Sequence, residues 1–297
     1  MRALGNYIMR GRLHAIGVVS VMTMLSLLLP PLTYVLSGAP VGLVSLRRGA
    51  RIGMQVILGS MVVMALLCYP AGINPLLAPA FAVSVWAPVW LCAVILRLTE
   101  SQGLLVMAAG ALGAVFVVLM HLMVDDVTGW WKSWFDTWVQ NHMTPDAASR
   151  YHSLLDSAMP MMNAMMASGM VISLVLTVIL ARWWQAILYN PGGFKAEFYR
   201  LRLPRYLAAA TFAVAVLSLV DVGLDKGLFR DLLAVLVFLY LFQGVAAVHR
   251  TVSARELSSG WLVGMYVLLL LLPPQTALLI ACVGMVDSWM GERKSLS

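Results

Sequence analysis

The stretch Val267-Leu268-Leu269-Leu270-Leu271-Leu272-Pro273-Pro274, together with Leu29-Pro30-Pro31 near the start of the chain, decides how this sequence is interpreted. Each places two consecutive prolines in an apolar run. Because proline removes a backbone donor and clashes with the preceding turn, a double proline interrupts a helix. In a bilayer such a break persists only where neighbouring protein or a cavity satisfies the freed backbone groups. Two interrupted segments are therefore the best indication of a binding site.

The composition is that of an integral membrane protein. The 297 residues are 61% hydrophobic and 11% charged, with a mean hydropathy of +0.88. Since a helix of about 20 residues crosses the hydrocarbon layer, the chain can supply about eight to ten spans. We predict an all-α, polytopic transmembrane helical bundle that forms one integral membrane domain over residues 1–297. The isoelectric point near 9.6 reflects Lys and Arg in short loops and not nucleic-acid binding.

Ten apolar runs are candidate transmembrane helices, and four of them are short. They cover residues 13–29, 32–46, 52–68, 76–96, 104–123, 158–181, 206–220, 232–248, 261–272 and 276–290. Because the first and last pairs of runs are separated only by the prolines, each Pro-Pro pair can lie at the bend of a hairpin or within one kinked helix.

Charge placement favours the hairpin interpretation. With the N-terminus in the cytoplasm and both broken segments treated as hairpins, sixteen of the 20 Lys and Arg residues lie on the cytoplasmic side. The four on the outer side are Lys132, Arg150, Lys226 and Arg230. This bias predicts ten crossings of a bacterial inner membrane, with both termini cytoplasmic.

The sequence contains no catalytic or metal-binding motif. It has no GxxxxGK[ST], GxSxG, HExxH or GxGxxG pattern, and no acidic pair or Ser/His/Asp set in a segment that would align it. Cys68, Cys92 and Cys282 lie in or beside apolar runs without the spacing of a disulfide or a zinc site. We therefore expect a protein that is not an enzyme and that holds no metal and no cofactor.

Two loops contain clusters of aromatic residues. In the predicted external loop, residues 124–157, aromatic residues recur at helical spacing, so we expect an amphipathic helix lying on the membrane, or alternatively a lid over an outward-facing cavity. The predicted cytosolic loop, residues 182–205, alternates aromatic and basic residues around the turn Asn190-Pro191-Gly192-Gly193. This loop can bind the anionic inner leaflet or a cytosolic partner.

Ionisable residues are rare in the apolar runs. His121, Asp125 and Asp126 lie where the fifth run ends and water can reach them, so we interpret them as interfacial residues. Asp287 lies within the last run, where we expect it to pair with Arg293 or with the arginine pair after the second run.

The sixth run combines methionines with small residues. Six methionines lie between Met159 and Met170, and soft sulfur ligands suit Cu(I). Methionine also fills irregular apolar spaces and is abundant throughout the chain, with 20 residues, so we interpret this group as packing. Asn163 on the same run can hydrogen-bond to another helix or face a ligand.

Several short stretches occur in a characteristic order along the chain. They are Leu29-Pro30-Pro31 with Val44 to Gly49, Trp183 to Ala186, Tyr189 to Phe194 with Glu197-Phe198, and Leu272-Pro273-Pro274 through Gly284 to Trp289. In that order they resemble the bacterial YybS-like family of predicted multi-pass membrane proteins, in its proteobacterial branch, over essentially the whole chain.

That resemblance implies a fold related to the S components of energy-coupling factor transporters. S components bind vitamins or metal ions in an outward-facing pocket and depend on a separate scaffold and ATPases. The same helical core also resembles a rod-shape-determining membrane subunit that acts through partner contacts. S components commonly present an Ala-xxx-Ala face from the first helix, whereas here Ala15 is followed four residues later by Val19.

We therefore predict a non-enzymatic inner-membrane protein that binds a small molecule or forms part of a transporter. Its ligand site is expected beside the two breaks or on the small-residue helix face, lined by Thr33, Tyr34, Asn163 and Gln275. The expected partners are membrane lipid and a separate energising or scaffold protein, and no nucleic acid.

The alternative is a structural or scaffolding membrane protein that acts through its cytosolic face. Its surface towards lipid or a partner protein would comprise Arg47, Arg48, Trp183, Trp184, Phe194, Tyr199 and Arg202.

Overall fold

The structure is a computed structural model that describes residues 2–29, 32–144, 157–220 and 225–290. All regular structure within these ranges is helical, so the predicted all-α class is confirmed. By length and composition, five helical segments can each cross a membrane. They are Ala50–Cys68, Leu77–Thr99, Gln102–Met123, Met159–Tyr189 and Lys226–Ala254. Three shorter apolar helices cover Arg12–Ser26, Arg205–Leu219 and Gly260–Leu271.

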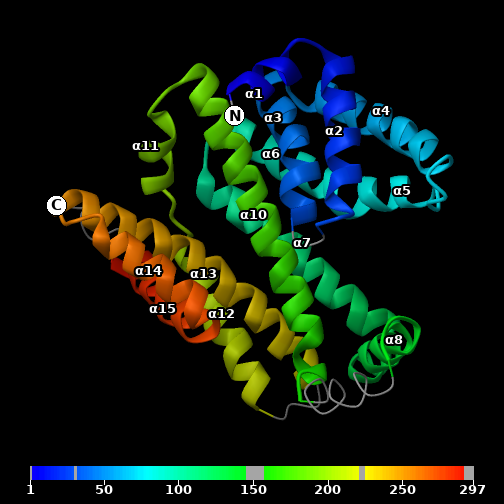
Figure 1. The fold of residues 1–297 in the computed structure, drawn as a ribbon. Coiled ribbons are helices and arrows are strands. Elements are labelled where there is room, and N and C mark those ends of the chain that lie inside the picture. The colour runs from blue at the N-terminus through cyan, green and yellow to red at the C-terminus, as the bar shows by residue number, and fades with distance from the viewer. Residues whose placement is uncertain (1, 30–31, 145–156, 221–224, 291–297) are drawn as a thin grey trace. The chain divides into compact units, whose positions relative to one another are not determined.

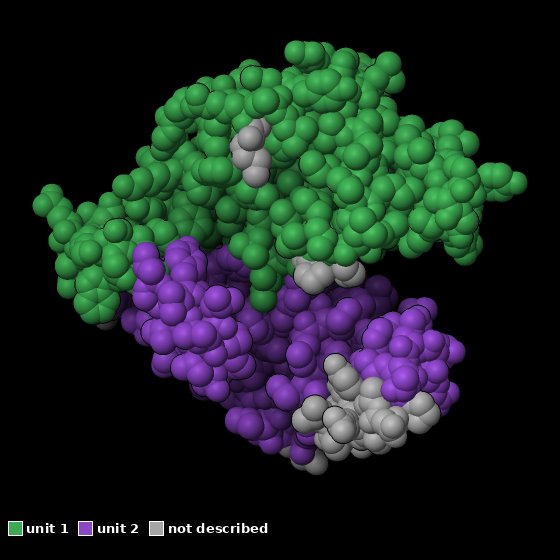
Figure 2. Space-filling view, in the orientation of Figure 1, with its two compact units in different colours: residues 1–109, 172–203, 246–262 green, residues 110–171, 204–245, 263–297 purple. Residues whose placement is uncertain are grey.

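The chain folds into two compact units, which Figure 2 colours separately. Unit 1 comprises residues 1–109, 172–203 and 246–262, and unit 2 comprises residues 110–171, 204–245 and 263–297. Three long helices in Figure 1 contribute residues to both units. They are α7 (Gln102–Met123), α10 (Met162–Tyr189) and α13 (Lys226–Ala254).

Unit 1 begins with a helical hairpin around the first Pro-Pro pair. Besides its parts of the three shared helices, the elements of unit 1 are α1 (Arg2–Met9), α2 (Arg12–Ser26), η2 (Tyr34–Gly38), α3 (Ala39–Arg48), α4 (Ala50–Cys68), α5 (Leu77–Phe81), η3 (Ala82–Trp86), α6 (Ala87–Thr99) and α11 (Gly193–Tyr199). At the end of α3, Arg48 donates a hydrogen bond to the carbonyl oxygen of Met9, just before α2 begins. The chain therefore reverses its direction between α2 and α3. Pro30 and Pro31 themselves lie outside the described residues.

Two π-helical segments in unit 1 precede the same tripeptide. The segment η2 leads into Ala39-Pro40-Val41, and η3 leads into Ala87-Pro88-Val89. A proline inside a helix removes one backbone hydrogen bond and crowds the preceding turn, and a wider π turn relieves that crowding. The hydroxyl of Tyr34 links the two segments by donating a 2.8 Å hydrogen bond to the carbonyl oxygen of Ser84.

The second Pro-Pro pair begins a helix of unit 2. The elements of this unit also include α8 (Val127–His142), η4 (Met159–Met161), α12 (Arg205–Leu219), α14 (Gly260–Leu271) and α15 (Pro273–Met290). Pro273 is the first residue of α15, where its missing N–H costs nothing. The hydroxyl of Thr276 donates a 3.1 Å hydrogen bond back to the carbonyl oxygen of Leu268, near the end of α14. A straight helix keeps these two atoms about a full turn further apart, so the chain folds back at this point.

Helices α13 and α15 approach each other closely at two glycines. A Cβ atom at Gly244 would overlap the carbonyl oxygen of Ile280, and one at Gly284 would overlap that of Tyr240. Glycine is required here because only a residue without a side chain lets two helix backbones come this near.

Asp287 is paired near the glycine crossing of α13 and α15. Its Oδ2 atom accepts a 2.9 Å hydrogen bond from Nε2 of the buried Gln243. The sequence interpretation assigned this carboxylate to an arginine. Of the two arginine sources considered there, Arg293 lies outside the described residues.

Alanine at Gly244 or at Gly284 is expected to destabilise the protein, because the added methyl group must separate two backbones. Overpacking of this kind costs about 1–3 kcal/mol, which lowers the Tm by several degrees. Gly264→Ala on α14 is the matched control, since a Cβ atom there meets nothing within 4 Å. Thermal unfolding of the three variants in detergent micelles measures the effect. Equal Tm values for all three would contradict the close crossing.

Candidate functional site

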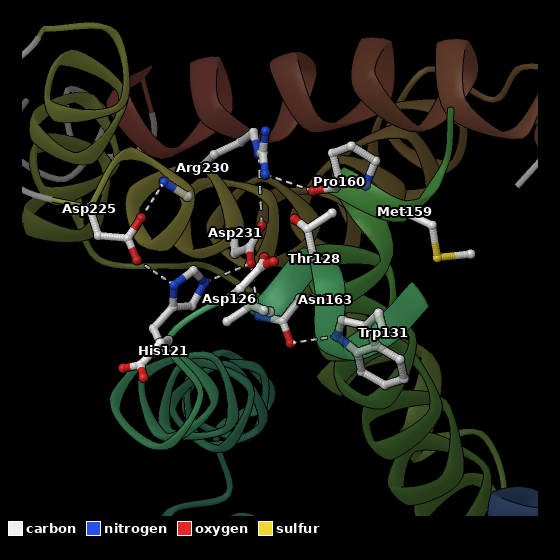
Figure 3. Close-up of a pocket in the computed structure, with 13 residues that line it drawn as sticks. His121, Asp126, Thr128, Trp131, Met159, Pro160, Asn163, Asp225, Arg230 and Asp231 are labelled. Carbon is white, nitrogen blue, oxygen red and sulfur yellow. Dashed lines mark hydrogen bonds and ion pairs between the residues drawn. The ribbon is translucent and has the colours of Figure 1, made fainter. Parts of the chain in front are cut away.

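A polar cavity of about 160 Å³ lies in unit 2 (Figure 3). It lies among the C-terminal end of α7, the segment leading into α8, the beginning of α10 and the beginning of α13. Charged and polar side chains from all four segments point towards one another there. The residues that matter most are separated by long stretches of sequence.

His121 lies between two carboxylates. It occupies the last turn of α7, and its side chain is only 9% exposed. Its Nδ1 atom is 2.5 Å from Oδ2 of Asp225, and its Nε2 atom is 3.0 Å from Oδ2 of Asp231. A histidine with a carboxylate on each side has no freedom to rotate without losing one of the two contacts, so the ring orientation is fixed.

Asp225 caps the beginning of α13. Its Oδ1 atom accepts the backbone N–H groups of Gly227 at 2.8 Å and of Leu228 at 3.3 Å, where the helix dipole also favours a negative charge. Desolvation raises the pKa of Asp225, but hydrogen bonds from His121 and from the two N–H groups, with the charge of His121, outweigh it. The pKa of Asp225 is therefore lowered, and the group is ionised at neutral pH.

Asp231 is the buried acid of the site. It lies in the second turn of α13, and its side chain is 2% exposed. Besides His121, its Oδ2 atom accepts a 2.8 Å hydrogen bond from Nδ2 of Asn163. Among the described residues, its buried Oδ1 atom has no hydrogen-bond donor, and the nearest cation is Nε of Arg230 at 3.9 Å. A buried carboxylate oxygen with no donor is costly, so this atom is available to a ligand.

Trp131 fixes the orientation of the Asn163 amide. The indole N–H of Trp131 is 3.4 Å from Oδ1 of Asn163, and an indole N–H can only donate. The acceptor end of the amide therefore faces Trp131, and the donor end faces Asp231. Trp131 itself is 7% exposed and packs with Val127 and Met159, which form an apolar wall beside the acids.

The amphipathic helix α8 has one buried aromatic face and one exposed aromatic face. Asp126 caps it by accepting the Gly129 N–H at 2.9 Å. Trp131 is buried, whereas the three exposed tryptophans form a separate stripe one turn apart, at Trp130, Trp134 and Trp138. The sequence pattern predicted one aromatic face, but the helix buries one aromatic stripe within unit 2 and exposes the other. Residues 145–156 of the predicted external loop lie outside the described residues.

Of the four predicted lining residues, Asn163 lines this cavity. Gln275 is exposed in the first turn of α15 in unit 2. Thr33 and Tyr34 belong to unit 1, where Thr33 lies 3.5 Å from the Ser26 carbonyl oxygen and Tyr34 bonds to Ser84 as described above.

Asp225 and Asp231 were missed by the sequence analysis, and His121 was interpreted only as an interfacial residue. The sequence contains only a weak signal for the two aspartates. Asp231 is one acid within the apolar helix Lys226–Ala254, next to Arg230, and an adjacent Arg-Asp pair is ordinarily read as a solvated helix end.

The predicted cytosolic surface lies mostly at the surface of unit 1. The guanidinium of Arg47 stacks over the ring of Tyr189 at 4.1 Å, and Trp183 is 38% exposed. Trp184 does not belong to this surface as predicted, because it is 5% exposed and packs within the core of unit 1. The remaining predicted members are exposed or half-buried, namely Arg48, Phe194, Tyr199 and Arg202.

A second cavity, of about 270 Å³, lies in unit 1 beside this surface. Arg182 lines it and is bound by both carboxylate oxygens of Glu197, at 2.8 Å and 2.5 Å. Arg97 donates a 2.5 Å hydrogen bond to the carbonyl oxygen of Leu46 at the end of α3. Arg97 and Arg182 therefore hold neighbouring helices together beside this cavity.

Replacing Asn163 with leucine is expected to destabilise the protein. The change keeps the shape of the side chain but leaves the Trp131 N–H and one contact of Asp231 unsatisfied, which costs about 1–3 kcal/mol. Asn141→Leu, at an exposed position of α8, is the matched control and should leave the Tm nearly unchanged. Thermal unfolding in detergent measures both variants. A Tm for Asn163→Leu at or above that of the control would show that the amide does not hold Asp231.

Comparison with known proteins identifies a family but no characterised relative. A search of the curated proteins gave no match, and a search of the solved structures gave none either. A family model matches residues 17–288, a range that includes the whole cavity with His121 and Asp231. The apolar helices described above agree with the description of that family. The chain belongs to the family described as "Predicted membrane protein (DUF2232)".

Proposed function

We propose that this protein is a non-enzymatic component of a transport system that binds a small cationic ligand in the cavity of unit 2. The observation that carries the proposal is the buried Asp231 carboxylate, whose Oδ1 atom has no hydrogen-bond donor in the part of the chain that the structure describes. Buried ionisable groups in apolar helices are costly and are retained where they bind an ion or a substrate.

The charge of the cavity lining selects a cation. Carboxylates predominate over the single guanidinium of Arg230, which is engaged by the Pro160 carbonyl oxygen at 2.6 Å. The carboxylates that line the cavity are those of Asp125, Asp126, Asp225 and Asp231. The indole of Trp131 also lines the cavity, and the face of an indole ring attracts cations. An anionic ligand would meet repulsion on most sides.

The size of the cavity restricts the ligand to a few heavy atoms. Its volume of about 160 Å³ is below the roughly 300–1,000 Å³ of pockets for drug-sized ligands. A vitamin of the size that S components capture does not fit this volume. The ligand that fits best is a small amine in its protonated form.

The topology proposed from the positive charges places this cavity on the outer side of the bacterial inner membrane. We propose ten crossings with both termini cytoplasmic, counting the two Pro-Pro segments as hairpins. The end of α7, the helix α8 and the beginning of α13 then all face outward. The YybS-like identity and the relation to S components remain part of this proposal, and so does the need for a separate energising protein.

Methylammonium is expected to raise the Tm of the purified protein, because a ligand that binds only the folded state stabilises it by about 2.7 kcal/mol at a concentration of 100 Kd. Acetate, of similar size and opposite charge, should have no effect. Asp231→Asn should abolish the methylammonium effect, whereas Asp136→Asn, the same change on α8 outside the cavity lining, should retain it. An equal response to both ions, or an equal loss in both variants, would disprove cation binding at Asp231.

The exposed segment α11 supports a second candidate function, in which the cytosolic face docks a partner protein. None of the residues of α11 is buried, and the rings of Phe194 and Phe198 stack at 5.9 Å. Under this alternative, photo-crosslinkers at Phe194 and at Tyr199 should capture one dominant protein in cells. Under the transport proposal the same crosslinkers should capture mainly lipid, and mass spectrometry of the adducts distinguishes the two.

A further inference from the structure

The two contacts of His121 involve both of its ring nitrogens. Its Nδ1 and Nε2 atoms each face a carboxylate oxygen, that of Asp225 at 2.5 Å and that of Asp231 at 3.0 Å. An ionised carboxylate only accepts hydrogen bonds, and a neutral imidazole has only one N–H to donate. Both contacts are hydrogen bonds only when both ring nitrogens carry a proton.

The other partners of the two carboxylates show that both act as acceptors. Asp225 receives two backbone N–H groups on its Oδ1 atom. Asp231 receives the Asn163 amide on Oδ2, and the orientation of that amide follows from the donor-only indole of Trp131. With both carboxylates ionised, His121 donates a hydrogen bond from each ring nitrogen as an imidazolium, and its Nε2–H group then occupies one side of Asp231.

We propose that a small primary ammonium ligand displaces one proton from His121 when it binds, so that the site exchanges a proton for the cation. This inference rests on the proposed cation site. An ammonium ligand would be a third positive group beside the buried carboxylate of Asp231, after His121 at 3.0 Å and Arg230 at 3.9 Å, and it would meet repulsion in a poorly solvated cavity. Release of the imidazolium proton removes that repulsion and keeps the charge of the site constant.

The exchange is a simple proton transfer. The Nε2–H bond of His121 breaks, its electron pair stays on the nitrogen, and the proton passes to water at the mouth of the cavity. An ammonium N–H then donates to Asp231 in place of the ring. The Nδ1–H contact with Asp225 is retained, so the histidine remains in position as the neutral tautomer.

The charged groups around His121 come from two segments besides its own helix. Those on the segment before α8 are Asp125 and Asp126, and those at the beginning of α13 are Asp225, Arg230 and Asp231. The beginning of α10 contributes the neutral Asn163. Among these groups His121 is the one whose two ring nitrogens both contact carboxylates, so it is the group whose proton the exchange involves.

An organic ammonium fits the site better than a metal ion does. Within the described residues, no group of three or more His, Cys, Asp or Glu side chains is arranged to hold a metal. The wall formed by Trp131 and Met159 is apolar and suits the carbon end of a small amine.

Isothermal titration with methylammonium tests the exchange. The titration is repeated at neutral pH in buffers that differ in ionisation enthalpy, and the dependence of the observed heat on that enthalpy counts the protons. We expect about one proton released per methylammonium bound, and an affinity that rises about tenfold per pH unit while His121 is protonated. His142→Gln, on the exposed part of α8, should behave like the wild type.

His121→Gln should bind methylammonium with no proton release and with little dependence on pH. Should this variant fail to fold, NMR of ¹⁵N-labelled histidine in the wild type gives the same answer, since one imidazolium signal should become that of a neutral ring on addition of methylammonium. Binding without proton release in the wild type would overturn the exchange and leave the cation site intact. Absence of any methylammonium binding would overturn both.

Discussion

Backbone polar groups in the membrane-spanning helices must find their partners within the chain, because lipid offers none. That constraint explains why the described backbone is helical and why hydroxyls on the apolar helices bond back to the preceding turn, as Thr23 does to the carbonyl oxygen of Val19 at 2.7 Å. It also explains how the chain tolerates its breaks. The hydroxyl of Thr276 reaches a carbonyl group across the second Pro-Pro pair, and Arg97 satisfies the end of α3.

The polar contacts of the acidic cavity differ from those in the rest of the described chain. Most polar contacts in the protein join neighbouring turns or close a helix end. In the cluster around Asp231, His121 and Asn163 instead contact one buried carboxylate from two other helices, and the indole of Trp131 donates to Asn163 from a third. Among the described residues, one oxygen atom of Asp231 still has no donor. A structural polar network is normally completed, since a half-satisfied one is worse than an apolar core. The Asp231 oxygen that has no donor among the described residues is the feature on which the proposed ligand site rests.

Conservation of charge connects the proposed ligand to the proposed exchange. At the depth of an apolar helix each uncompensated charge costs a few kcal/mol, so a site that gained a cation outright would have to be rebuilt around it. A histidine that gives up its proton leaves the electrostatic balance of Asp225 and Asp231 unchanged. The Trp131 wall can then stay in place while one positive group replaces another.

The amino-acid sequence by itself determined the helical class, the positions of the apolar helices, the break at Pro273 and the presence of an aromatic amphipathic segment within residues 124–157, because each depends on local hydropathy and backbone chemistry. It also indicated Asn163, from its place on a helix of small residues. The tertiary structure alone decided the site, since His121 meets Asp225 across 104 positions and Asp231 across 110. Periodicity shows which face of a helix is apolar, but not which other helix packs there, so the convergence of four segments on one carboxylate, and the burial of Trp184, follow only from three-dimensional packing.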